Sequence, residues 1–175
     1  LPESAGGAIL TSTLPLPVCQ PGRTGCAAAV DLGTTTVVAR LYDLASGAEL
    51  ATESGWNVQA PYGADVISRI QYTLEQPDGL QELSQRSREQ VWALIERVLA
   101  RCGREADTLR EITLAGNTVM QHLFAGYSVR GIAAAPFQPE TLFDAPEAGS
   151  LHGVPVHFAP CVAGYVGGDI TAGLL

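Results

Sequence analysis

The sequence predicts an α/β domain with a mixed sheet flanked by helices. Three observations support this class: consecutive strand patterns open the domain after residue 25, two segments with helical periodicity follow them, and strand and helix patterns then alternate. The expected order of elements is βββ-α-α-β-α-β-α. Strands joined by tight turns pair antiparallel and strands joined through helices pair parallel, so this order gives a mixed sheet.

Strands are expected where short runs of apolar or β-branched residues lie between turn residues. Residues 26–30 form an apolar run, and residues 36–42 alternate apolar and polar side chains. A third strand follows the Ser46-Gly47 turn. Two later strands are expected at residues 111–115 and 154–159. The first three are close enough in the chain to pair as an antiparallel unit.

Helices are expected where apolar side chains recur every three or four residues. Residues 64–74 show this pattern, and a longer segment over residues 80–102 ends at Gly103, a residue type that favours the left-handed conformation after a helix. The apolar face of the longer segment consists of Val91, Leu94, Ile95, Val98 and Cys102. A short helix follows at residues 118–124, and another begins at Gly164.

The chain of 175 residues is about one domain long, preceded by a segment with linker chemistry. Residues 1–25 are rich in turn formers, and we expect a linker or the tail of a preceding domain there. Residues 26–175 form the domain, in which residues 133–153 are a Pro-rich loop. Charged residues make up only 16% of the chain and hydrophobic residues 46%, which indicates a buried core rather than a disordered chain.

The charge and hydropathy patterns exclude two classes of partner. The net charge is −8, and all ten basic residues are Arg scattered along the chain, so no basic face for nucleic acid is expected. No apolar run approaches the roughly 18 residues that a membrane span needs, and no signal-peptide pattern opens the chain. We therefore expect a soluble cytoplasmic protein.

The cysteines favour free thiols. The chain contains four of them: Cys19, Cys26, Cys102 and Cys161. They form no C-x-x-C pair, and no His lies at zinc-site spacing from them. We therefore expect reduced thiols and no metal site built from cysteine.

A turn with the chemistry of a phosphate site lies between the first two expected strands. It reads Asp31-Leu32-Gly33-Thr34-Thr35-Thr36. Backbone N–H groups and hydroxyls in such a turn can bind an anion, and a carboxylate two residues before the Gly can hold Mg²⁺ through water. An ordinary hairpin turn uses the same residue types, so both interpretations remain open at this point.

Four ordered stretches carry a resemblance to a known family. Residues 29–36 resemble the first phosphate loop of the superfamily of actin, sugar kinases and heat-shock-chaperone ATPases. With three further stretches, the chain resembles the ATP-dependent reductive activators of corrinoid proteins over residues 26–175. These stretches read NVQ and YGADVISRI within residues 57–70, TLAGNTVM at residues 113–120 and AGYVGGDITAG at residues 163–173. The resemblance implies a ribonuclease-H-like, actin-like ATPase fold, of which this chain is the first lobe.

The resemblance implies a role for each matching residue of the loop. Asp31, Gly33, Thr34 and Thr35 match the residues that bind the β- and γ-phosphates of ATP, and Asp31 orients Mg²⁺. Asp169 matches an acidic residue that positions the attacking water, which is the catalytic role in phosphoryl transfer. The alternative role of Asp169 is capping of the helix that follows.

Two further polar positions have competing interpretations. Asn117 lies between an expected strand and an expected helix, where it either contacts nucleotide at the crevice or caps the helix. Asp65 and Arg69 are four residues apart on one expected helix. That spacing favours a solvated ion pair over a contact with substrate.

The implied function is that of a fragment of an iron–sulfur protein that couples ATP hydrolysis to the reduction of cobalt, from Co(II) to Co(I), in a corrinoid protein partner. The parent protein would use ATP and Mg²⁺, and a [2Fe–2S] cluster is expected only in an upstream domain. The superfamily's second phosphate loop is missing here, so we expect this chain alone to bind ATP weakly and to be inactive. A small-molecule kinase of the same superfamily and a non-catalytic protein-binding module are the alternatives.

Overall fold

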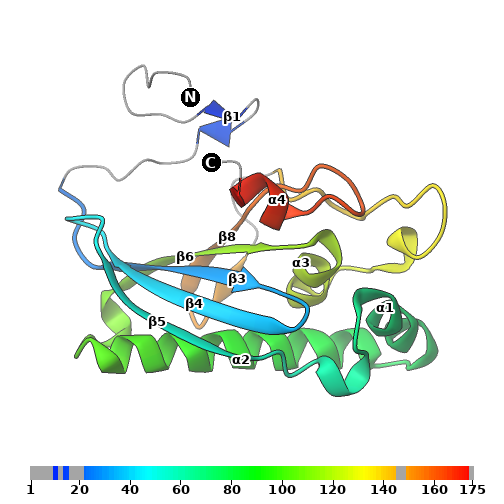
Figure 1. Ribbon diagram of the computed structural model, residues 1–175, viewed down its shortest axis with the longest axis horizontal. Helices are drawn as coiled ribbons and strands as arrows, with labels where there is room; N and C mark the ends of the chain where they lie inside the picture. The colour runs from blue at the N-terminus through cyan, green and yellow to red at the C-terminus, as the bar shows by residue number, and fades with distance from the viewer. Residues whose placement is uncertain (1–9, 12–13, 16–21, 145–148, 174–175) are drawn as a thin grey trace.

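The computed structural model describes residues 10–11, 14–15, 22–144 and 149–173, and its main feature is a six-stranded mixed sheet (Figure 1). The strands lie in the order β5-β4-β3-β6-β8-β7. They are β3 (Cys26–Leu32), β4 (Thr36–Asp43), β5 (Glu49–Trp56), β6 (Leu109–Gly116), β7 (Ser150–Leu151) and β8 (Val154–Phe158). The β3–β4, β4–β5 and β7–β8 pairs are antiparallel, and β6 is parallel to both β3 and β8. The predicted mixed sheet is therefore confirmed.

The helices lie on both faces of this sheet. They are α1 (Val66–Glu75), α2 (Gly79–Arg101), α3 (Thr118–Ala125) and α4 (Gly168–Gly173), with 3₁₀ helices at Ala60–Tyr62, Ala106–Thr108 and Arg130–Ile132. The long helix α2 crosses one face of the sheet, whereas α4 lies on the opposite side (Figure 1). The predicted order βββ-α-α-β-α-β-α is found, with β7 added before β8.

The core lies between α2 and the central strands. Every second residue of β3 and β4 is buried, as the pleat of a strand with one covered face requires. These side chains share one apolar cluster with the stripe on α2, which is formed by Val91, Leu94, Ile95 and Val98. The predicted stripe is confirmed at these four residues, which are buried, whereas the fifth, Cys102, is the C-cap of α2 and is only partly buried against the core. The remaining residues of β3 and β4 point to the side of α4, where the polar positions lie.

The predicted end of the long helix is also confirmed. Gly103 follows the C-terminus of α2 with φ +60°, and the N–H of Arg104 donates to the Leu99 carbonyl at 3.0 Å. This is the Schellman arrangement, in which a left-handed residue lets the chain satisfy the last free carbonyls of a helix.

Three predicted boundaries need correction. Strand β7 lies inside the segment expected to be a loop at residues 133–153, because the left-handed His152 and Gly153 (φ +49° and +82°) turn the chain back onto β8. The last helix begins at Gly168 and not at Gly164. Within the expected linker, β1 (Leu10–Thr11) and β2 (Leu14–Pro15) pair with each other, and most of residues 1–25 lie outside the described residues.

Candidate functional site

The carboxyl ends of the parallel strands β3 and β6 bring two of the predicted segments together. The loop of Gly33, Thr34 and Thr35 follows β3, and Asn117 follows β6. The register pairs Leu32 with Gly116, so both strands end at the same level of the sheet. Ligands of open α/β sheets bind outside the carboxyl ends of parallel strands, which makes this edge the candidate site.

Asp31 and Asp169 line one cavity on the side of the sheet opposite α2. This cavity of about 430 Å³ also contacts Arg40, Thr113 and Ala115. Burial raises the pKa of Asp31, the negative charge of Asp169 raises it further, and Arg40 opposes both effects. A divalent cation can stabilise a site in which one carboxylate raises the pKa of another, because the cation offsets the repulsion between their charges.

The loop after β3 presents unpaired backbone donors. Within the described segments, no protein acceptor pairs with the N–H of Gly33, Thr34 or Thr35. A Cβ at Gly33 would lie 2.5 Å from the carbonyl oxygen of Thr36, so only Gly allows this tight turn. Successive free N–H groups in a turn form a concave anion site. The geometry is therefore compatible with the phosphate-binding role that the residue types suggest.

Asn117 caps helix α3 and also contacts the loop. Its Oδ1 accepts from the N–H of Met120 at 3.0 Å, which is the N-cap geometry of the alternative interpretation. Its Nδ2 donates to Oγ1 of Thr34 at 3.1 Å. The cap is thus confirmed, and the same side chain ties the start of α3 to the loop.

Asp169 lies in the first turn of α4 and not at the N-cap. Its Oδ1 accepts from the N–H of Ile170 at 2.9 Å, within its own turn, so the capping alternative is not what the structure shows. Gly167 and Gly168 precede it. A Cβ at Gly167 would lie 2.5 Å from the backbone nitrogen of Thr118 at the start of α3, and a Cβ at Gly168 would lie 2.6 Å from the Ala159 carbonyl oxygen. Side chains at these positions would push α4 and Asp169 away from the sheet.

The predicted solvated ion pair between Asp65 and Arg69 is wrong. Arg69 is fully buried, and its Nη2 donates to the carbonyl oxygen of Thr34 at 2.7 Å. Asp65 instead caps α1, with Oδ1 accepting from the N–H of Ser68 at 2.8 Å. Spacing alone places two side chains on one helix face, but it does not show that tertiary contacts cover that face.

Sequence reasoning also missed Gln121, which links the end of β6 to the residue that follows β8. Gln121 is fully buried; its Oε1 accepts from the N–H of Gly116 at 3.1 Å, and its Nε2 donates to the Ala159 carbonyl at 2.9 Å. A long polar side chain on a short helix of mostly apolar residues is the one signal that could have identified it, because a buried polar group needs hydrogen-bond partners.

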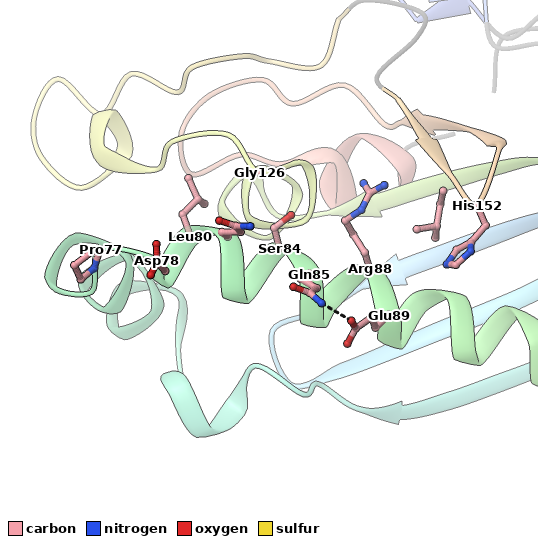
Figure 2. Close-up of a pocket in the computed structure, with 11 residues that line it drawn as sticks. Pro77, Asp78, Leu80, Ser84, Gln85, Arg88, Glu89, Gly126 and His152 are labelled. Atoms are coloured by element: carbon pink, nitrogen blue, oxygen red, sulfur yellow. Dashed lines mark hydrogen bonds between the residues drawn. The ribbon is translucent and has the colours of Figure 1, made fainter.

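A second cavity lies away from this edge of the sheet. It has a volume of about 620 Å³ and is lined by residues of α2, the end of α3 and the β7–β8 turn, among them Ser84, Arg88 and His152 (Figure 2). Arg88 is already used there, because its Nη2 donates to the Ser150 carbonyl at 2.7 Å. None of the predicted site residues lines this cavity.

The described residues contain neither a metal-binding cluster nor a membrane-spanning helix. The described segments contain no group of three or more His, Cys, Asp or Glu residues that could hold a metal ion. Cys26, Cys102 and Cys161 are free thiols, and Cys19 lies outside the described residues. No helix in those segments is both long and apolar enough to cross a membrane.

Comparisons with known proteins agree with this fold. The corrinoid activation enzyme RamQ of Eubacterium limosum is 35% identical over 157 residues, which are 84% of this chain and 26% of RamQ. A solved reductive activator for corrinoid, iron–sulfur protein superposes with a TM-score of 0.82 at 39% identity, covering 89% of this chain and 26% of that chain. The chain thus spans about a quarter of the length of these relatives.

The family comparison covers nearly the whole domain. The model described as RACo middle region matches residues 26–175, which include the loop after β3, Asn117 and Asp169. The match begins at Cys26, which is also the predicted first residue of the domain. The chain therefore belongs to the RACo middle region family.

Proposed function

We propose that this chain is the first lobe of the ATPase domain of an iron–sulfur-containing reductive activator of corrinoid proteins, with the lobe spanning residues 26–175. The observation that carries the proposal is the convergence of Asp31 and Asp169 on one cavity beside a loop with unpaired N–H groups. The names of the two relatives support a corrinoid protein as the partner.

Each side chain has a defined task in this proposal. The N–H groups and hydroxyls of Thr34 and Thr35 bind the terminal phosphates of ATP, and Asp31 holds Mg²⁺ through water. Asp169 orients a water molecule for in-line attack on the γ-phosphorus; the bond to the bridging oxygen breaks and ADP leaves. Positioning and charge neutralisation supply most of the catalysis in such reactions.

The hydrolysis is coupled to an electron transfer that is uphill by itself. In the parent protein, an upstream [2Fe–2S] domain supplies the electron that converts Co(II) to Co(I) in the partner. ATP binding and hydrolysis change the affinity of the activator for that partner, because each nucleotide state favours a different arrangement of the two lobes. The reaction takes place in a reducing cytoplasm, where the free thiols persist.

The test is the Asp31→Ala substitution in the full-length parent protein. We expect ATP turnover to fall at least 100-fold, because the divalent cation loses its carboxylate while the loop remains. Asp107→Ala is the matched control, since Asp107 is an exposed aspartate on the 3₁₀ helix before β6. Unchanged turnover in Asp31→Ala would remove the site assignment.

A further inference from the structure

Helix α1 contains a buried cation that the proposed ATPase function leaves without a role. Arg69 lies on α1 with none of its side chain exposed to solvent. Within the described residues, no carboxylate lies within ion-pair distance of its guanidinium. Burial lowers the pKa of Arg69, and the negative charge of Asp65 opposes only part of that effect. Burying a charge without full compensation is unfavourable, so an arginine in this setting needs further compensation from elsewhere.

The hydrogen bonds of Arg69 converge on the loop after β3 and its surroundings. Nη2 donates to the Thr34 carbonyl at 2.7 Å, Nε donates to the Gly63 carbonyl at 3.0 Å, and Nη1 lies 3.3 Å from Oε1 of Gln59. Nη1 also lies 3.1 Å from Sδ of Met120 on α3. All of these partners are neutral. They bind donors of the guanidinium but carry no negative charge, and Asp65 offsets the effect of burial only in part, so its positive charge is incompletely compensated behind the loop.

A second buried side chain holds the neighbouring carbonyls of the same loop. Asn57 is 2% exposed; its Nδ2 donates to the Gly33 carbonyl at 2.8 Å, and its backbone N–H donates to the Thr35 carbonyl at 2.8 Å. Together with Arg69, it binds three consecutive carbonyls from one side. Figure 1 shows the turn between β3 and β4 beside α1, which carries Arg69, and α3, which carries Met120.

This arrangement orients the free donors of the loop. In a trans peptide, the carbonyl of one residue and the N–H of the next point in opposite directions. The Gly33 and Thr34 carbonyls point towards the side chains of Asn57 and Arg69. The N–H groups of Thr34 and Thr35 therefore point away from these two side chains. A guanidinium bound to the carbonyl also polarises the Thr34–Thr35 peptide, which makes its N–H a stronger donor to an anion.

We propose that Arg69 is the positioning residue of the phosphate loop and supplies a buried positive charge behind it for the triphosphate of Mg·ATP. This inference rests on the proposed ATPase function. Bound phosphate would complete the compensation that Asp65 gives only in part, so the loop is preorganised for a multiply charged anion and not for a neutral ligand.

The test compares Mg·ATP with adenosine in the full-length parent protein. In Arg69→Met, we expect the Kd for Mg·ATP to rise at least tenfold by calorimetry. The inhibition constant of adenosine against ATP turnover should change less than twofold, because adenosine carries no phosphate. Arg69→Lys keeps the charge but cannot bond Gly63 and Thr34 together, so it should recover part of the affinity. Arg97→Met is the matched control, since Arg97 is exposed on α2 and lies 3.8 Å from Glu53.

The outcomes separate this inference from the proposed function. Wild-type protein that fails to bind Mg·ATP contradicts the ATPase proposal itself. Folded Arg69→Met that binds Mg·ATP as tightly as wild type overturns the role of Arg69 alone, as does an equal loss of affinity for adenosine. If Arg69→Met does not fold, the affinity of Arg69→Lys and Asn57→Asp for Mg·ATP tests the inference instead. Wild-type affinity in both variants overturns the inference, and weaker binding of Mg·ATP in either variant supports it.

Discussion

The Gly168→Ala substitution tests how α4, and with it Asp169, is held against the sheet. The structure leaves no room for a methyl group at Gly168, where a Cβ would clash with Oε1 of Gln121 and would lie 2.6 Å from the Ala159 carbonyl oxygen. Both atoms take part in the buried network of Gln121, which joins β6 to the segment after β8. The new methyl group can be accommodated only if Gln121 or α4 moves.

The magnitude follows from the two ways in which the clash can relax. Displacing the Gln121 amide leaves buried polar groups without partners, which costs about 1–3 kcal/mol for each group. Forcing an extra methyl into a packed site costs about 1–3 kcal/mol. Because movement of α4 relieves part of both costs, we expect the free energy of unfolding to fall by about 2–3 kcal/mol. In a protein of this size, that corresponds to a decrease in Tm of about 4–12 °C.

Thermal unfolding of the 175-residue chain, followed by circular dichroism, measures this loss. Gly173→Ala is the matched control, because Gly173 is in the same helix and a Cβ there would meet nothing within 4 Å. That control should keep the wild-type Tm or raise it slightly, since Ala favours helix over Gly. A Gly168→Ala protein with a Tm within about 2 °C of wild type would refute the packing argument.

Two further predictions concern the N-cap of α3 and a buried histidine within that helix. Asn117→Ala removes the acceptor for the N–H of Met120 and the bond to Thr34, so the free energy of unfolding in urea denaturation should fall by about 1 kcal/mol. Asn117→Asp keeps the acceptor and should recover most of that free energy. Equal losses in both variants would contradict the N-cap role of Asn117. Burial lowers the pKa of His122, whose Nδ1 bonds the Thr118 carbonyl, although that bond and Glu140 oppose the shift. The unfolded chain therefore binds the proton more readily, and the stabilising effect of neutral His122 is complete above about pH 6.5 and is lost as the pH falls. The urea midpoint of wild type should fall between pH 7.5 and pH 5.5 by more than that of His122→Gln, and parallel pH profiles would show that His122 does not contribute.

Local signals in the sequence predicted most of the elements correctly. Alternation over residues 36–42 and the apolar stripe on α2 reflect burial on one face, and each can be recognised without knowing what covers that face. Gly103 is equally local, because the end of a helix depends on the conformation of one residue. The two-residue strand β7 was missed, since its pairing depends on a partner strand and a turn at His152 rather than on its own pattern.

The residues of the candidate site also fall into those that local sequence signals identified and those that only the tertiary structure revealed. The order of Asp, Gly and Thr after a buried strand identified the loop, and the strand-to-helix junction identified Asn117, because both depend on neighbouring residues in the chain. Only the tertiary structure showed that Asp31 and Asp169 share a cavity and that Arg69 is buried behind Thr34. Residue type and spacing determine which chemistry is available, whereas burial and charge compensation depend on which distant segments fold over a side chain. For that reason, Arg69 was expected in a solvated ion pair but is a buried cation in the structure.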